Sequence, residues 1–362
     1  MSEAAILQSV RERLSVAIQG FQPPPFYSIN VSLWIAASAL QKAIRRGRKQ
    51  TALRAAAGLL QVEPDRLWRR LGCLSFEDVG VADFEVVSLT VAALTGKRFR
   101  QSLGGDWPVA SYLIGRLAGA TKTRATDDLL MSAETHPEFA EARSELATRS
   151  SENLIEVATG SAPIHIRALA AWFAAGTNRW RSAHLPSRPG NAKILFDAMG
   201  ASEAEAETVA IARQGWRKLG EALCPFTAML KPFAPADFSA TTDDDLPPEV
   251  FIGDLPGWCL DQYSREGRRA LQVFMEGGTL TARWVRAHIP VRERIPFLGG
   301  IVFRAEGGLL RSRLRWALGD ELRRLNDIEC AGSDCIDASD ILAMTRADIP
   351  ELNRVRAAVM GV

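Results

Sequence analysis

One short run in the last third of the chain concentrates groups that bind phosphate. It reads Asp261-Gln-Tyr-Ser-Arg-Glu-Gly-Arg-Arg269, and on a helix its acid, hydroxyl and guanidinium groups would lie within two turns. Arginine presents a planar fork of donors that matches phosphate oxygens, and Gly267 would let a phosphate or another chain approach the backbone closely. The run predicts a nucleic-acid contact through Arg265, Arg268 and Arg269. The alternative is an ordinary i, i+4 ion pair between Asp261 and Arg265.

Positive charge is concentrated in two blocks, although the net charge of the chain is only +2. Residues 41–70 hold nine Lys or Arg against two acids, and residues 265–324 hold thirteen Arg against six acids. Between the blocks, residues 127–156 hold eight acids against two bases, and a further acidic run is Asp243-Asp244-Asp245. Because basic blocks can form phosphate-binding surfaces, the sequence predicts DNA binding. The alternative is that arginine merely solvates helix faces.

Motifs for nucleotide hydrolysis are missing from the sequence. Triphosphate-binding motors use a G-x-x-x-x-G-K-[ST] loop whose amides and lysine neutralise the phosphates, and neither Gly96-Lys97 nor Lys122-Thr123 has the glycines of such a loop. We interpret paired acids such as Asp127-Asp128 as solvated loops in preference to Mg²⁺ ligands. Histidines and cysteines are scattered without zinc-ligand spacing. We therefore expect a non-enzymatic protein with no catalytic residue, metal site or cofactor.

Helical periodicity dominates the elements that must position these residues. Apolar residues recur at spacings of three and four in residues 33–44, 51–60 and 64–74, which predicts amphipathic helices joined by short turns. Gly47 is expected to end the first of them, and Ser75 of Ser-Phe-Glu-Asp78 to cap the start of a new helix. Further helices are predicted over residues 84–94, 108–118, 127–133, 137–146, 163–175, 192–199, 203–223, 259–275, 309–325 and 348–360.

These patterns predict a mainly α fold in which an antiparallel helical array precedes a smaller, mostly helical C-terminal domain with a short strand or extended segment. The expected parts are a leading helix and Pro-rich linker (1–30), the array (31–231), an acidic Pro-rich linker (232–257) and an Arg-rich domain (258–362). The composition of the second linker predicts that it packs no core. No apolar run reaches the ~18 residues needed to span a bilayer, and the N terminus lacks the layout of a secretory signal. We expect no membrane partner and a cytoplasmic location.

A set of residues between positions 38 and 83 follows a family pattern. In sequence order they are Ser38, Ala39, Leu40, Lys42, Ile44 and Arg45, then Arg69, Arg70 and Leu71, then Ser75, Glu77, Asp78, Gly80, Ala82 and Asp83. The pattern resembles the helical region that follows the motor domain in clamp-loader-like AAA+ ATPases, the family of replication-associated recombination protein A and the Werner-helicase-interacting proteins. A fainter match continues through residues 117–124, including Lys122, and the resemblance as a whole covers residues 34–133.

The resemblance implies self-association and a role beside DNA. In that family this region assembles subunits, which here implies a homo-oligomer formed through the helices of residues 53–117. It also implies that Lys42, Arg45, Arg46, Arg69 and Arg70 lie near a nucleic-acid surface.

Our leading hypothesis is an accessory protein in DNA replication, repair or mobile-element maintenance. Two alternatives stay open: a helical scaffold that binds a partner ATPase or replication protein without touching DNA, and a nucleic-acid-processing enzyme whose site is assembled from scattered residues. Arginine blocks on one face would favour DNA binding, whereas carboxylates that converge in a cleft would favour an enzyme.

Overall fold

The computed structural model describes residues 2–200, 206–235, 240–330 and 338–362. Helices make up most of it, and the strands of these residues form two small antiparallel sheets. The prediction of a mainly α fold with short extended segments is therefore confirmed.

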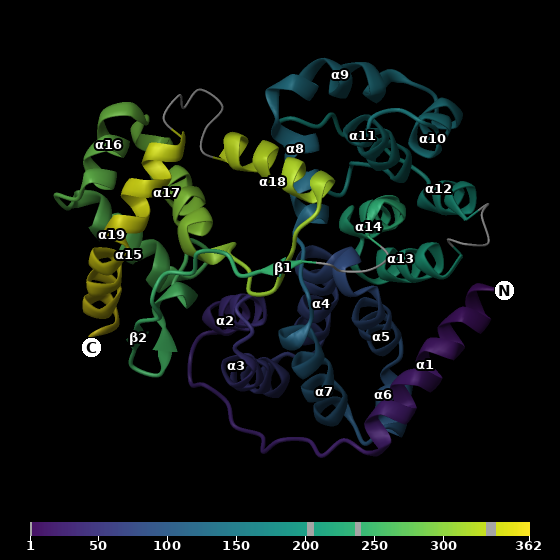
Figure 1. Cartoon of the computed structure of the whole chain (residues 1–362), viewed down its shortest axis with the longest axis horizontal. Coiled ribbons are helices and arrows are strands. Elements are labelled where there is room, and N and C mark those ends of the chain that lie inside the picture. Colours follow the sequence, from purple (N-terminus) through teal and green to yellow (C-terminus); the bar gives the residue numbers. More distant parts are fainter. Residues whose placement is uncertain (1, 201–205, 236–239, 331–337) are drawn as a thin grey trace.

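The N-terminal helices pack around one large apolar core (Figure 1). They are α1 (Glu3–Gln19), α2 (Leu33–Arg45), α3 (Lys49–Val62), α4 (Pro64–Leu74), α5 (Phe84–Leu94), α6 (Lys97–Ser102) and α7 (Asp106–Gly119). Helix α2 starts where the Ser32 hydroxyl accepts a hydrogen bond from the Ile35 amide at 3.4 Å. It ends before Gly47, whose φ of 65° suits the residue after a helix, as the sequence predicted.

A second group of helices extends the same core. They are α8 (Ala125–Thr135), α9 (Ala140–Thr148), α10 (Ser151–Thr159), α11 (Ile164–Ala175), α12 (Ala192–Met199), α13 (Ala206–Leu219) and α14 (Leu223–Leu230). The single helix expected over residues 203–223 is instead α13 followed by α14, because the chain turns at Gly220, whose φ is 70°. Part of that expected helix, residues 203–205, lies outside the described residues.

The C-terminal helices build a smaller core. They are α15 (Arg265–Glu276), α16 (Leu280–His288), α17 (Arg294–Val302), α18 (Ala317–Cys330) and α19 (Ala338–Met360). The small core gathers apolar side chains of α15, α16, α17 and α19. Helix α18 instead lies against α8 (Figure 1). Its Leu322 belongs to the large core. The C-terminal region is thus smaller and mostly helical, as predicted, but one of its helices belongs to the N-terminal unit.

Three details of the C-terminal region differ from the sequence analysis. The helix expected over residues 309–325 begins only at Ala317, because Arg313–Leu314 form a short strand, β4. Helix α19 does not start at Asp348, because Asp348 accepts a hydrogen bond from the Thr281 amide and Pro350 lies inside the helix. The segment expected to be helical from residue 259 begins its helix only at Arg265, where Ser264 caps α15 by accepting from the Gly267 amide at 3.0 Å.

The segment predicted as an acidic linker is packed where the structure describes it. Strand β1 (Thr241–Thr242) pairs with β4 (Arg313–Leu314), and β2 (Phe251–Ile252) pairs with β3 (Leu255–Pro256). Ile252 and Leu255 are buried in the large core. Asp244 bonds to Arg313 at 2.8 Å and to Arg323 at 3.0 Å. The expectation of an unpacked linker fails here because these acids meet arginines distant in sequence.

Candidate nucleic-acid interface

A buried cluster of charges lies at the centre of the family-like motif. Arg45 of α2 donates to Asp78 and to Glu77, each at 2.7 Å. Arg124 donates to the same two carboxylates at 2.6 and 3.1 Å and also to Asp127. Asp78 has no exposed surface, so this cluster lies in the interior of the protein. Arg45 is paired there with the two neighbouring carboxylates.

The local backbone explains how two consecutive acids reach this cluster. Residues Ser75–Val79 form a π-helical turn that continues α4, followed by a 3₁₀ turn, Gly80–Asp83. The hydroxyl of Ser75 donates back to the Gly72 carbonyl at 2.8 Å, so the prediction that Ser75 caps a new helix is wrong. Asp83 is the cap instead, because it accepts from the Val86 amide at 3.2 Å. Gly80 ends the turn with a φ of 51°, which favours glycine.

The carboxyls of this cluster titrate differently because three of them share two guanidinium groups. Burial would raise the pKa of Glu77, but Arg45 and Arg124 hold that pKa below its ordinary value. Burial raises the pKa of Asp78 in spite of the same two arginines. Burial also raises the pKa of Asp127 to about 7, although Arg124 opposes it. The raised pKa of Asp127 thus lies near neutral pH, and the pKa of Asp78 is raised as well.

A second buried pair explains the run that begins at Asp261. Lys42 donates to Asp261 at 2.6 Å, and Ser38 donates to the same carboxylate oxygen at 2.7 Å. Burial would raise the pKa of Asp261, but Lys42 and the hydrogen bonds hold it below its ordinary value. Asp261 precedes α15, so the expected i, i+4 pair with Arg265 is not formed. A Cβ on Gly267 would lie 2.1 Å from the Asp261 carbonyl oxygen, so the close neighbour that this glycine admits is the chain's own backbone.

Three cations that were predicted to lie at the DNA surface are therefore buried inside the protein. Lys42, Arg45 and Arg46 are 2–4% exposed. Arg46 donates to the Glu306 carbonyl at 2.7 Å and lies over the Trp258 ring, its guanidinium carbon 5.2 Å from the centroid. Charges already paired inside the protein do not displace counterions from a phosphate backbone.

Lys122 of the family-like motif is also an interior residue. Its ammonium group donates to the carbonyls of Ala118 and Ala120 at 2.9 and 2.7 Å, and burial lowers its pKa to about 8. Its backbone bonds to Ser312 and Leu314. Lys122 therefore joins the N-terminal helices to the segment before α18 and is not placed to meet a ligand.

Above the buried charges the surface is hollowed into a cleft of about 440 Å³. Its lining includes Glu77, Asp127, Asp261 and Phe303, together with Trp34 and Tyr263 at its border. The guanidinium carbons of Arg45 and Arg124 lie 5.2 and 5.1 Å from the centroid of the Phe303 ring. Three carboxyls thus converge in one cleft, each held by a neighbouring cation. We call this hollow the inner cleft.

The arginines of the second block lie beside the inner cleft. A hollow of about 610 Å³ is lined by Trp34, Tyr263, Arg265, Arg268 and Arg269, together with Ser264 and Gln272. Trp34 and Tyr263 line both hollows, so the two hollows are neighbours on the surface. Arg70 lines the inner cleft and donates to Gln41 at 3.4 Å. We call the surface made by these two aromatic residues and four arginines the arginine–aromatic surface.

The structure thus brings together only part of the predicted nucleic-acid set. Arg70, Arg265, Arg268 and Arg269 meet around the two hollows, whereas Arg69 bonds to Glu221 at 2.9 Å and lines neither.

Sequence reasoning missed the aromatic residues of this surface. Trp34 is 58% exposed and Tyr263 is 69% exposed, and neither was among the predicted site residues. The usable signal was an aromatic residue within an arginine-rich run, which is typical of nucleic-acid-binding surfaces.

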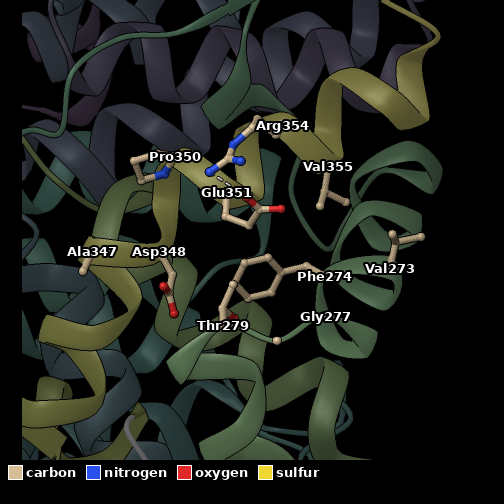
Figure 2. Close-up of a pocket in the computed structure, with 11 residues that line it drawn as sticks. Val273, Phe274, Gly277, Thr279, Ala347, Asp348, Pro350, Glu351, Arg354 and Val355 are labelled. Carbon is tan, nitrogen blue, oxygen red and sulfur yellow. Dashed lines mark ion pairs between the residues drawn. The ribbon is translucent and has the colours of Figure 1, made fainter.

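A separate hollow of about 390 Å³ lies between α15 and α19. Figure 2 shows Phe274 and Thr279 on one side, and Asp348 with an ion pair between Glu351 and Arg354 on the other. One carboxylate oxygen of Asp348 and one of Glu351 already have partners within the protein. We therefore assign no chemistry to this hollow.

Comparisons with protein families, curated proteins and solved structures found no match to this chain. The resemblance to the clamp-loader-like region stays a prediction. Within the described ranges, no group of three or more His, Cys, Asp or Glu is arranged to hold a metal ion. No helix in those ranges has both the length and the apolar character to cross a bilayer.

Proposed function

We propose that this protein binds single-stranded nucleic acid, with little sequence preference, at the arginine–aromatic surface. The observation that carries the proposal is the placement of two exposed aromatic rings, Trp34 and Tyr263, among arginines from two distant parts of the chain. Surfaces that bind single strands combine positive charge along the backbone path with rings on which bases stack.

Charge availability supports the same proposal. Arg265, Arg268 and Arg269 are exposed on α15, and no ion pair involving them is found among the described residues. Many other arginines of the second block are paired: Arg313 and Arg323 with Asp244, Arg304 with Asp327, and Arg311 with Asp243. Arg265, Arg268 and Arg269 therefore keep their positive charge available at the arginine–aromatic surface.

The cellular setting follows from the resemblance alone. We propose an accessory, non-enzymatic role in DNA replication, repair or mobile-element maintenance in the cytoplasm, with a partner ATPase supplying any nucleotide hydrolysis. A processing enzyme is the less supported alternative, because the carboxyls that converge in the inner cleft are all engaged by cations. DNA and RNA single strands are both to be tested, since stacking and phosphate contacts serve either.

The test is a salt titration with labelled oligonucleotides. We expect log affinity for a single strand to fall linearly with log salt, by about 0.7 per neutralised phosphate. Arg268→Ala with Arg269→Ala should weaken binding to all sequences alike and make this slope shallower. A control is Arg292→Ala with Arg354→Ala, which removes two exposed charges outside the surface, each paired with a nearby glutamate. Equal effects of the two double variants would contradict the proposed site.

The aromatic residues separate single-strand from duplex binding. Base stacking contributes about 1–3 kcal/mol per base, so Trp34→Ala and Tyr263→Ala should each weaken single-strand binding by about 5- to 150-fold and change duplex binding much less. Undetectable binding at low salt, where phosphate attraction is strongest, would overturn the proposal and favour the protein scaffold.

A further inference from the structure

We infer that the inner cleft receives one unstacked nucleobase whose edge donates N–H groups, and that Asp127 is the acceptor that reads this edge. The inference rests on the proposed single-strand binding and adds a base-recognition site to it. Nucleic-acid-binding proteins read an unstacked base through hydrogen bonds to its exposed edge.

The first argument is access. Trp34 and Tyr263 belong to both the outer hollow and the inner cleft, so a strand stacked on these rings passes the mouth of the cleft. The cleft volume of about 440 Å³ lies within the range of roughly 300–1,000 Å³ of small-molecule sites. One base can therefore leave the stack and enter while its neighbours stay on the rings.

The second argument is the fixed position of an acceptor. Arg124 donates to Oδ2 of Asp127 and is itself held by Glu77 and Asp78. The side chain of Asp127 is only 17% exposed. Among the described residues, none forms a hydrogen bond with its Oδ1. A carboxylate held on one side by arginine presents its other oxygen with little loss of conformational entropy.

The third argument is the match between a carboxylate and an amino group. Carboxylates accept hydrogen bonds from the N4 amino group of cytosine. Cytosine and guanine each carry an amino donor, which thymine lacks.

One cation of the lining is able to meet the phosphate of a bound base. Lys42, Arg45, Arg124 and Arg304 are each paired with a carboxylate, whereas Arg70 has no ion pair among the described residues. Arg70 makes only a 3.4 Å bond to Gln41 and is the lining cation best able to turn to a phosphate at the mouth. A strand and a free nucleotide share this chemistry, and the experiment separates them.

The experiment measures the affinity of the full-length protein for a thymidine oligonucleotide and for the same oligonucleotide with one cytosine, one guanine or one abasic position. We expect cytosine or guanine to strengthen binding by about tenfold, since good side-chain pairs discriminate by roughly that much, and the abasic site to weaken it. Asp127→Asn should remove the preference while binding to the thymidine strand persists.

A second variant keeps the inference falsifiable if Asp127→Asn disturbs folding. Met131 lines the inner cleft but not the outer hollow, so Met131→Trp should fill the cleft and abolish the base preference without changing the salt slope. Fluorescence of a single 2-aminopurine, which rises when a base unstacks, should increase on binding to the wild type and not to Met131→Trp.

Two further comparisons show whether the base belongs to a strand or to a free nucleotide, and which of the two proposals a negative result contradicts. Cytidine or guanosine monophosphate that binds as tightly as the strand would support the cleft as a base site and assign it to a free nucleotide; much weaker binding would assign it to a strand. Strand binding with no base preference, and with no effect of Met131→Trp, would overturn this inference and leave the arginine–aromatic surface standing. Absence of all strand binding would overturn the proposed function instead.

Discussion

At the scale of single residues, the buried cluster sets three carboxyls, Glu77, Asp78 and Asp127, against the guanidinium groups of Arg45 and Arg124. Two cations cannot neutralise three ionised carboxylates inside a protein, where an unpaired charge is costly. Asp127 lines the inner cleft, and its pKa is raised to about 7. A proton on Asp127 balances the cluster at and below this pH, so Asp127 can accept from a base edge only above it.

This imbalance predicts a pH dependence of stability with a definite sign. Between the ordinary pKa of an aspartate, 3.8, and the folded value of about 7, the folded protein keeps a proton that the unfolded chain has lost. The free energy of unfolding should therefore fall as pH rises from 5 to 7, by up to about 1.4 kcal/mol per pH unit from this group. Urea unfolding at several pH values measures it.

The Asp127→Asn variant removes this titrating group. Its free energy of unfolding should show a smaller decline than that of the wild type over the same pH range. Parallel pH profiles for the two proteins would show that Asp127 does not hold the extra proton.

At the scale of elements, the acidic segment before β2 joins parts of the fold that the helices alone leave separate. Strand β1 pairs with β4, and Asp244 beside β1 holds Arg313 of β4 and Arg323 of α18. The Asp244 side chain is 5% exposed, whereas that of Asp245 is 88% exposed. Two adjacent aspartates of one acidic run thus have opposite environments.

This contrast supplies a matched pair of variants. Asp244→Ala should lower the free energy of unfolding by about 3–5 kcal/mol, because it leaves the buried Arg313 without its partner, and should increase amide hydrogen exchange across residues 310–327. Asp245→Ala should change stability by only about 0.5 kcal/mol, as surface substitutions do. Equal small effects would mean that the segment is a linker after all.

The same contrast shows how far sequence reasoning reaches. Periodicity predicted α2, α5 and α12 well, because the buried residues of an amphipathic helix recur at spacings of three and four. It failed in the run Ser75–Asp78 and at Asp261, where local rules favour a helix cap and an i, i+4 pair. The carboxylates of Asp78 and Asp261 instead bond to cations more than thirty residues away. Pairings of that kind leave no mark on local spacing, so the inner cleft was not predictable.

At the scale of the whole molecule, the assembly state tests the family resemblance. The apolar faces of α2 and α3 are buried in the chain's own core, so an interface between two copies of the chain must use other residues. Tyr27 and Val62 are among the exposed large apolar side chains in the N-terminal part. We predict a homo-oligomer by light scattering at about tens of micromolar, a concentration at which micromolar contacts form, and a lower mass for Val62→Glu.

A wild-type monomer at that concentration would remove the main implication of the resemblance. The single-strand proposal would be unaffected, because the arginine–aromatic surface is built from one chain.

The return of α18 to α8 has a consequence for synthesis on the ribosome. The N-terminal helices emerge first, yet the surface of α8 that α18 covers is completed by Leu322 and by a hydrogen bond of 2.6 Å from Asn326 to Asp128. That surface stays open while nearly two hundred further residues are translated. A nascent chain of this protein therefore carries an unfinished apolar face for most of its elongation, and chaperones that recognise such faces should bind it before release and not after.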